Sequence, residues 1–83
     1  MDTYLILGAK WRDEENNNTY CNARVINGST GETEFYIGYQ YGYDNQYSYE
    51  AKKLIEERFG RHVNIVDLGC FKIKKSDLMN DRF

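Results

Sequence analysis

The sequence contains one segment with clear helical spacing, and an unusually aromatic loop leads into it. From Gln46 onward, apolar side chains recur every three or four residues, which predicts an amphipathic helix. Its apolar positions are Tyr47, Ala51, Leu54, Ile55 and Phe59. Asp44 or Asn45 is placed to cap the start of this helix, and Gly60 is a natural stop after it. We therefore expect strands to supply the rest of the core.

Three segments before the helix alternate between inward and outward side chains, as half-buried strands do. They are Thr3–Trp11, Tyr20–Asn27 and Thr33–Tyr41. In the first segment we place Leu5 and Leu7 on the core face and Tyr4 on the other face. Polar connections separate the three segments: an Asn-rich run that reads as a loop or a long hairpin tip, and an Asn-Gly turn. This pattern predicts an antiparallel meander.

A last strand is expected after the helix, within Val63–Lys74, where Gly69 marks a bulge or a break. One bent strand and two short strands fit this pattern equally well. Pairing of this segment with the first strand would complete the sheet, and Ser76 and Asp77 are placed to cap a final turn. The predicted fold is α+β, a single domain over residues 1–83 with element order β-β-β-α-β and the helix packed on one sheet face. Beneath the helix we expect Leu5, Leu7, Cys21, Val25, Phe35 and Ile37.

Composition narrows the class of protein. The 83 residues are 41% hydrophobic and 29% charged, which indicates a folded globular chain. The net charge of −2 disfavours non-specific binding to DNA. Cys21, Cys70 and the single His62 are too few for a zinc site, and we expect both cysteines to stay reduced as small buried side chains.

Targeting and catalytic patterns are missing from the sequence. It has no signal peptide and no apolar run of the length that a membrane span requires, so we expect a cytoplasmic protein without a membrane partner. No spacing pairs a nucleophile with a base or gathers carboxylates for hydrolysis. We expect neither enzymatic activity nor a cofactor or metal ion.

The aromatic loop is the first candidate for a functional surface. Five tyrosines lie within the eleven residues from Tyr39 to Tyr49, more than a core of this size can bury. Tyrosine provides stiff contact area together with a hydroxyl group, and it is enriched in recognition loops. The predicted partner-binding residues are Tyr41, Tyr43, Tyr49, Asp44 and Asn45. The alternative is that Tyr39, Tyr43 and Tyr47 only hold the start of the helix on the sheet.

The sheet face away from the helix is the second candidate. We place Tyr4, Tyr20, Arg24 and Tyr36 on this face. Such a face resembles the stacking platform of single-stranded nucleic-acid binding proteins, and it equally suits self-association into a homodimer. The alternative is that these tyrosines only pair across neighbouring strands, with their hydroxyl groups in water.

Several short motifs resemble those of small uncharacterised bacteriophage proteins that carry a YGYG-x-QY motif at the start of a helix. The segment from Gln40 to Tyr47, followed by Ala51 and Leu54, is similar to that motif, with Asp44 in place of its second glycine. The strand start Asn18-Thr19-Tyr20 and the ending Lys74–Leu78 are also similar. This resemblance implies a viral accessory protein in the cytoplasm of a host cell, where chains of this size bind and block host proteins. Anti-CRISPR inhibitors are one such class.

The sequence thus favours a non-enzymatic phage-type protein that binds a host protein and inhibits or redirects it. A component of a defence system such as CRISPR-Cas is an example of such a partner. The alternative is a single-stranded nucleic-acid binding module that uses the tyrosine-rich sheet face. These two functions differ in salt dependence, because only the second should lose affinity steeply as salt is added.

Overall fold

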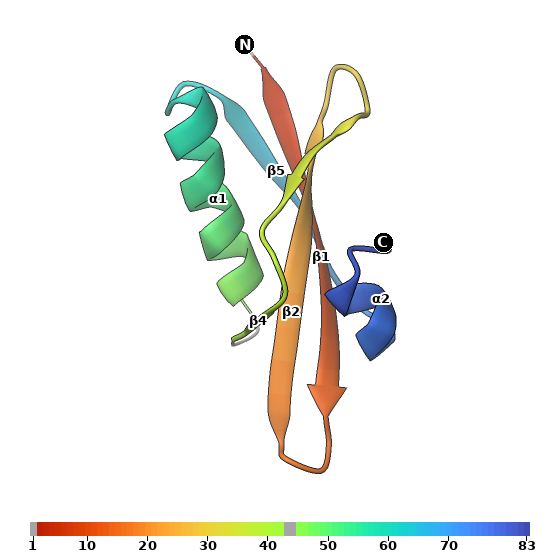
Figure 1. Ribbon diagram of the computed structural model, residues 1–83. Coiled ribbons are helices and arrows are strands. Elements are labelled where there is room, and N and C mark those ends of the chain that lie inside the picture. The colour runs from red at the N-terminus through yellow and green to blue at the C-terminus, as the bar shows by residue number, and fades with distance from the viewer. Residues whose placement is uncertain (1, 43–44) are drawn as a thin grey trace.

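The computed structural model describes residues 2–42 and 45–83 and has an α+β fold, as predicted. Figure 1 shows a twisted, mostly antiparallel sheet with one long helix packed against it. The strands are β1 (Thr3–Asp13), β2 (Asn18–Asn27), β3 (Thr33–Tyr36), β4 (Gln40–Tyr41) and β5 (Asn64–Lys72), and the helices are α1 (Gln46–Phe59) and α2 (Lys75–Met79). The strand order is β3-β2-β1-β5, and β4 also pairs with β2.

Strands β1 and β2 form a long hairpin that extends beyond the rest of the molecule (Figure 1). Antiparallel pairing runs without interruption from Tyr4 opposite Asn27 to Asp13 opposite Asn18. The Asp13 carboxylate closes the tip by accepting hydrogen bonds from the Asn16 side chain and from two backbone N–H groups. Strand pairing therefore continues into the Asn-rich run from both sides and leaves residues 14–17 as the turn. The two strands are longer than predicted because cross-strand hydrogen bonds outweigh the weak strand propensity of these polar residues.

The face of β1 that meets α1 is the opposite of the one predicted. Tyr4, Ile6 and Gly8 point toward α1, whereas Leu5 and Leu7 lie half-buried on the other face. Both faces of β1 are apolar, so alternation alone does not show which one is inward. Pairing with β2 decides it, because Ile6 lies directly opposite the buried Val25.

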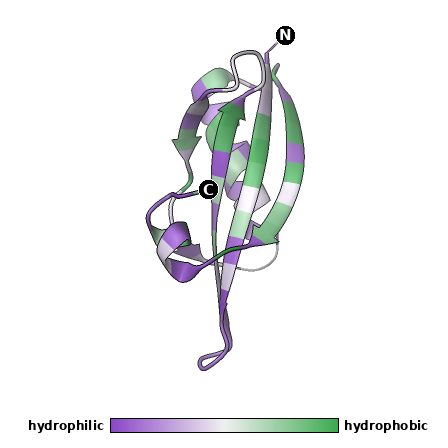
Figure 2. Ribbon diagram, turned by 90° about the vertical axis from the view of Figure 1, so that its right-hand side faces the viewer, coloured by the Kyte–Doolittle hydropathy of each residue, from purple (hydrophilic) through white to green (hydrophobic). Residues whose placement is uncertain are grey.

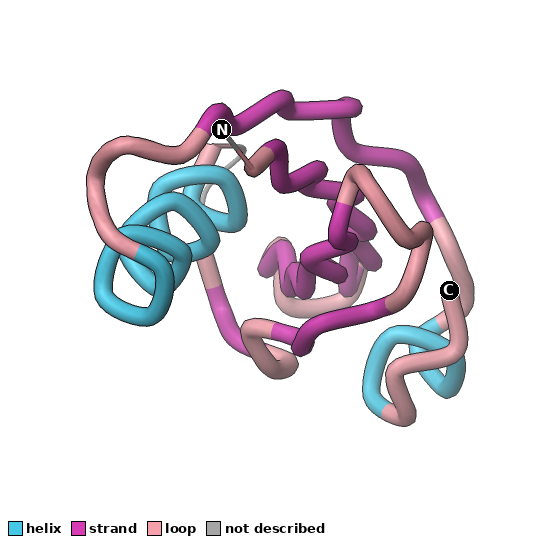
Figure 3. Tube along the Cα trace, turned by 90° about the horizontal axis from the view of Figure 1, so that it is seen from above, coloured by secondary structure: helices cyan, strands magenta, loops and turns pink. Residues whose placement is uncertain are grey.

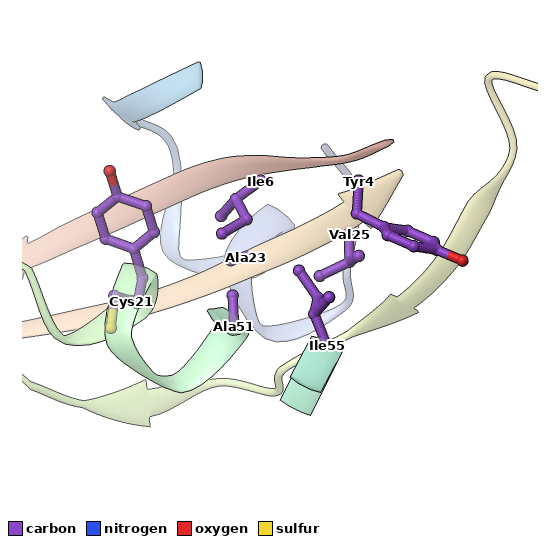
Figure 4. Packing of buried hydrophobic residues seen from close by; sticks show 8 residues of the cluster. Tyr4, Ile6, Cys21, Ala23, Val25, Ala51 and Ile55 are labelled. Carbon is purple, nitrogen blue, oxygen red and sulfur yellow. The ribbon is translucent and has the colours of Figure 1, made fainter. Parts of the chain in front are cut away.

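The core lies between the sheet and α1 (Figure 4). Its buried members are Tyr4, Ile6, Cys21, Ala23, Val25, Tyr47, Ala51 and Ile55. The Tyr4 ring stacks on the Phe59 ring with their centroids 4.3 Å apart. Of the predicted core residues, Val25 and Ile55 are fully buried, Phe35 and Ile37 pack against the margin, and Leu54 is only half-buried.

The third predicted strand is split into β3 and β4. Between them Gly38 has a φ of +99°, a conformation that favours glycine. The Gly38 N–H donates a hydrogen bond of 3.0 Å to the side-chain oxygen of Asn22, a fully buried polar residue on β2. The break directs β4 along the outer half of β2, toward the start of α1.

Strand β5 is one strand, the first of the two alternatives, and it pairs with β1, which completes the sheet. The pairing is parallel, and its register shifts at the level of Gly69, which has a φ of +98°. The glycine therefore marks a bulge within one continuous strand and does not end the strand.

Helix α2 packs on the sheet face opposite α1, and Figure 3 shows the two helices on opposite sides of the sheet. Leu78 is fully buried there, and the Asn22 side-chain amide donates hydrogen bonds to the Leu78 carbonyl and the Asp81 carboxylate. Figure 2 looks onto this face and shows that α2 covers only part of it. Apolar side chains on the rest of the face include Val66, which is exposed.

Candidate functional site

The structure brings three of the predicted partner-binding residues to one open groove. Tyr41 and Tyr49 are 56% and 66% exposed, and with Asn45 they line a groove of about 600 Å³. The groove is lined by Arg12, Asn17, Thr19, Tyr41, Gly42, Asn45, Gln46 and Tyr49. The other two predicted residues, Tyr43 and Asp44, lie outside the described residues. We call this feature the tyrosine groove.

One wall of the tyrosine groove is built where β4 passes into α1. Tyr41 lies opposite Tyr20 in the pairing of β4 with β2, and the Gly42 N–H donates a 3.1 Å hydrogen bond to the Thr19 carbonyl. A Cβ atom at Gly42 would lie 2.8 Å from the Cβ of Gln46, so this close approach requires glycine. Strand pairing and close packing therefore fix the position of the Tyr41 backbone.

The start of α1 places Tyr49 at the groove. Asn45 occupies the N-cap position, and its carbonyl accepts a 3.2 Å hydrogen bond from the Tyr49 N–H. The Asn45 side chain makes no capping hydrogen bond, contrary to one of the two capping predictions. Tyr49 faces outward from the first turn, whereas Tyr47 points inward and is buried. The same turn thus supplies one tyrosine to the core and one to the groove.

The second wall of the tyrosine groove comes from the β1–β2 hairpin. Arg12 lies opposite Thr19 in this hairpin, and its guanidinium donates a hydrogen bond to the Asn17 side chain. These residues were not predicted from the sequence, because they lie more than twenty positions before Tyr41 in a polar run that resembles a plain loop. Only the register of β2 against β4 brings them together.

An aromatic stack supports Tyr41 from the side. The rings of Tyr20 and Tyr39 stack with a centroid distance of 5.1 Å, and Trp11 stacks on Tyr20 at 5.8 Å. The Tyr41 ring meets Tyr20 edge-on at 5.7 Å. The Lys75 ammonium lies 5.1 Å from the centre of the Trp11 ring, a favourable cation–π geometry. These contacts limit the positions open to Tyr41 before any partner binds.

The residues of the alternative surface do not form one open face. Tyr4 is 4% exposed and lies under α1, on the side of the sheet opposite the other three. Tyr20 belongs to the aromatic stack. The Tyr36 hydroxyl donates to the Phe83 carbonyl, and the Nε of Arg24 is buried with no hydrogen-bond partner in the described part of the chain.

The pKa values of Tyr47 and Asp67 are shifted, and these two side chains contact each other. Burial and the adjacent Asp67 raise the pKa of Tyr47 to about 12. The Tyr47 hydroxyl donates a 3.0 Å hydrogen bond to Asp67. Burial acts to raise the pKa of Asp67, but hydrogen bonds from the Ser48 side chain, the Gly69 N–H and Tyr47 outweigh it, so the net shift is downward. This hydrogen bond joins the buried Tyr47 side chain on α1 to β5.

No group of three or more His, Cys, Asp or Glu side chains suited to a metal ion occurs within residues 2–42 and 45–83. In the same residues, neither helix is long and apolar enough to cross a membrane. Comparisons with protein-family models, curated proteins and solved structures find no match to this chain.

Proposed function

We propose that this chain is a non-enzymatic binding protein that inhibits or redirects a host protein by direct contact through the tyrosine groove. One observation carries the proposal: Tyr41 and Tyr49, both more than half exposed, line the same groove from a strand and a helix. Tyrosines held in this way are typical anchors of protein interfaces, because they bury much area and lose little conformational entropy.

The composition of the groove supports a protein partner. The tyrosine rings provide apolar area, and Arg12, Asn17 and Thr19 provide donors and acceptors on the facing wall. Interface cores combine aromatic residues with arginine in this manner. The aromatic stack beside Tyr41 lowers the entropic cost of binding, because the ring is held before the partner arrives.

The proposed biological setting comes from the sequence motifs. Their resemblance to small bacteriophage proteins supports an accessory role in the cytoplasm of a host cell. A component of a defence system such as CRISPR-Cas is one host protein that such a chain would block. In this proposal, the tyrosine groove binds and blocks a surface that the host protein needs for its own activity.

Affinity capture with matched variants tests the proposal. The tagged chain, a Tyr41→Ala/Tyr49→Ala variant and a Leu68→Ala control are expressed in bacterial cells, and the retained proteins are quantified by mass spectrometry. Leu68 is a suitable control because it is 51% exposed but lies on β5, outside the groove lining. We expect one host protein to be retained by the parent and the control and lost from the double variant. Equal retention by all three would place the binding surface elsewhere.

Salt provides the second readout. A contact centred on tyrosines is expected to change little between 50 and 200 mM salt, whereas binding to a nucleic acid weakens steeply over a range of this order. A captured complex that contains nucleic acid and dissociates in this range would favour the nucleic-acid alternative.

A further inference from the structure

Three cationic side chains meet on one face of the sheet beside the tyrosine groove. Lys10 on β1 and Lys72 on β5 are direct partners in the parallel pairing, and Arg12 lies two residues further along β1 on the same face. Thr19 on β2 lies directly opposite Arg12. These four residues line a small pocket of about 170 Å³. Neighbouring strands therefore place three positive charges and a hydroxyl group around one space.

Within residues 2–42 and 45–83 no carboxylate forms an ion pair with this cluster, because the one ion pair there joins Arg82 to Asp77. Two acids on the neighbouring elements α1 and β5 have partners of their own. Glu50 accepts a hydrogen bond from the Gln46 amide, and Asp67 accepts hydrogen bonds from Tyr47 and the Gly69 N–H. Like charges directly opposite each other destabilise a sheet. A bound anion would remove this repulsion.

The chemistry of the pocket fits a phosphoryl group. Arginine offers a fork of N–H donors that matches phosphate oxygens, lysine adds compact positive charge, and the threonine hydroxyl donates one further hydrogen bond. A phosphate monoester carries close to two negative charges and three acceptor oxygens at neutral pH. We propose that Lys10, Arg12, Lys72 and Thr19 form a binding site for one phosphoryl group.

A polyanion suits the site less well than a single group. The pocket is small, the whole chain carries a net charge of −2, and Glu14 and Glu15 lie at the adjacent hairpin tip. Extended nucleic acid would have to pass these like charges. Arg12 and Thr19 line both the pocket and the tyrosine groove. If the proposed function holds, a phosphorylated side chain next to the segment bound in the groove would reach the pocket.

Titration of the isotope-labelled chain with phosphoserine, followed by NMR, tests the site. We expect saturable shifts of the Thr19 and Lys72 amides. Binding should strengthen from pH 5 to 7, because the phosphoryl group loses its second proton near pH 6. Lys10→Gln and Lys72→Gln should each weaken binding about tenfold, the loss of a charge-assisted hydrogen bond of about 1.4 kcal/mol. Lys52→Gln, the same charge change on the exposed side of α1, should have no effect.

Stability measurements separate a binding defect from a folding defect. Lys72→Gln removes a repulsion with Lys10, so its melting temperature should equal or exceed that of the parent. The double variant Tyr41→Ala/Tyr49→Ala should still bind phosphoserine, because neither tyrosine lines the pocket. The phosphoryl site and the partner-binding role of the tyrosine groove can therefore be disproved independently. Chemical shifts that do not saturate would overturn the proposal. So would a Lys52→Gln variant that weakens binding as much as Lys10→Gln and Lys72→Gln do, or a tetraglutamate peptide that binds as tightly as phosphoserine. Tighter binding of an oligothymidylate that requires Tyr41 would indicate a nucleic-acid interface instead.

Discussion

Replacing Tyr47 with alanine should destabilise the protein by about 3 to 5 kcal/mol, the range measured for buried aromatic residues. Tyr47 is only 6% exposed, and its ring covers Gly8 so closely that a Cβ atom there would lie 2.6 Å from Cε2. A buried aromatic ring removes about 150 to 250 Å² from water. At about 25 cal/mol per Å², this burial contributes at most roughly 4 to 6 kcal/mol. The loss is large, because a chain of this length has a total stability of about 4 to 12 kcal/mol.

Urea denaturation of Tyr47→Ala, Tyr47→Phe and Tyr49→Ala measures this loss and its origin. Tyr47→Phe keeps the ring and removes only the hydrogen bond to Asp67, so it should cost about 0.5 to 1.5 kcal/mol. Tyr49→Ala, on the same helical turn but 66% exposed, should stay within about 0.5 kcal/mol of the parent. A loss below about 1 kcal/mol for Tyr47→Ala, or equal losses at both tyrosines, would refute the packing of α1 on β1 described above.

Three further predictions follow from the core. Ile6→Ala should cost about 2 to 5 kcal/mol and clearly more than Leu7→Ala in the same denaturation assay, and the reverse order would contradict the register of β1. The free energy of unfolding should fall as pH rises from about 9 to 12, because the folded protein keeps the Cys21 and Tyr47 protons that the unfolded chain releases. Tyr47→Phe should reduce the part of this decline that lies above pH 10. Burial raises the pKa of Cys21 to about 11, so iodoacetamide at pH 8 should modify it only after denaturation, and rapid native labelling would show that the core is open.

Patterns among residues close together in the sequence predicted the main helix and the places where glycine is required. The helix from Gln46 to Phe59 has the predicted bounds, and Gly60 follows it with a φ of +90°. Gly69 lies at a bulge, one of the two alternatives that the sequence left open for this glycine. Each depends on a periodicity or on a backbone conformation that favours glycine.

Long-range pairing decided the remaining features. Leu5 and Leu7 were assigned to the wrong face because β1 is apolar on both sides, and only the register with β2 selects Ile6. The exposure of Tyr41 and Tyr49 was predicted correctly from the excess of tyrosine in one loop. The facing residues Arg12 and Thr19 were not predicted, because their nearness to Tyr41 depends on how β4 pairs with β2.

The most direct test of the proposed function is the dissociation constant of the purified complex, measured by calorimetry for the parent, Tyr41→Ala, Tyr49→Ala and the Leu68→Ala control. We expect each tyrosine variant to lose about 1 to 3 kcal/mol of binding free energy while its melting temperature stays near that of the parent. Leu68→Ala should bind like the parent. Unchanged affinity in both tyrosine variants would contradict the assignment of the tyrosine groove as the partner-binding surface.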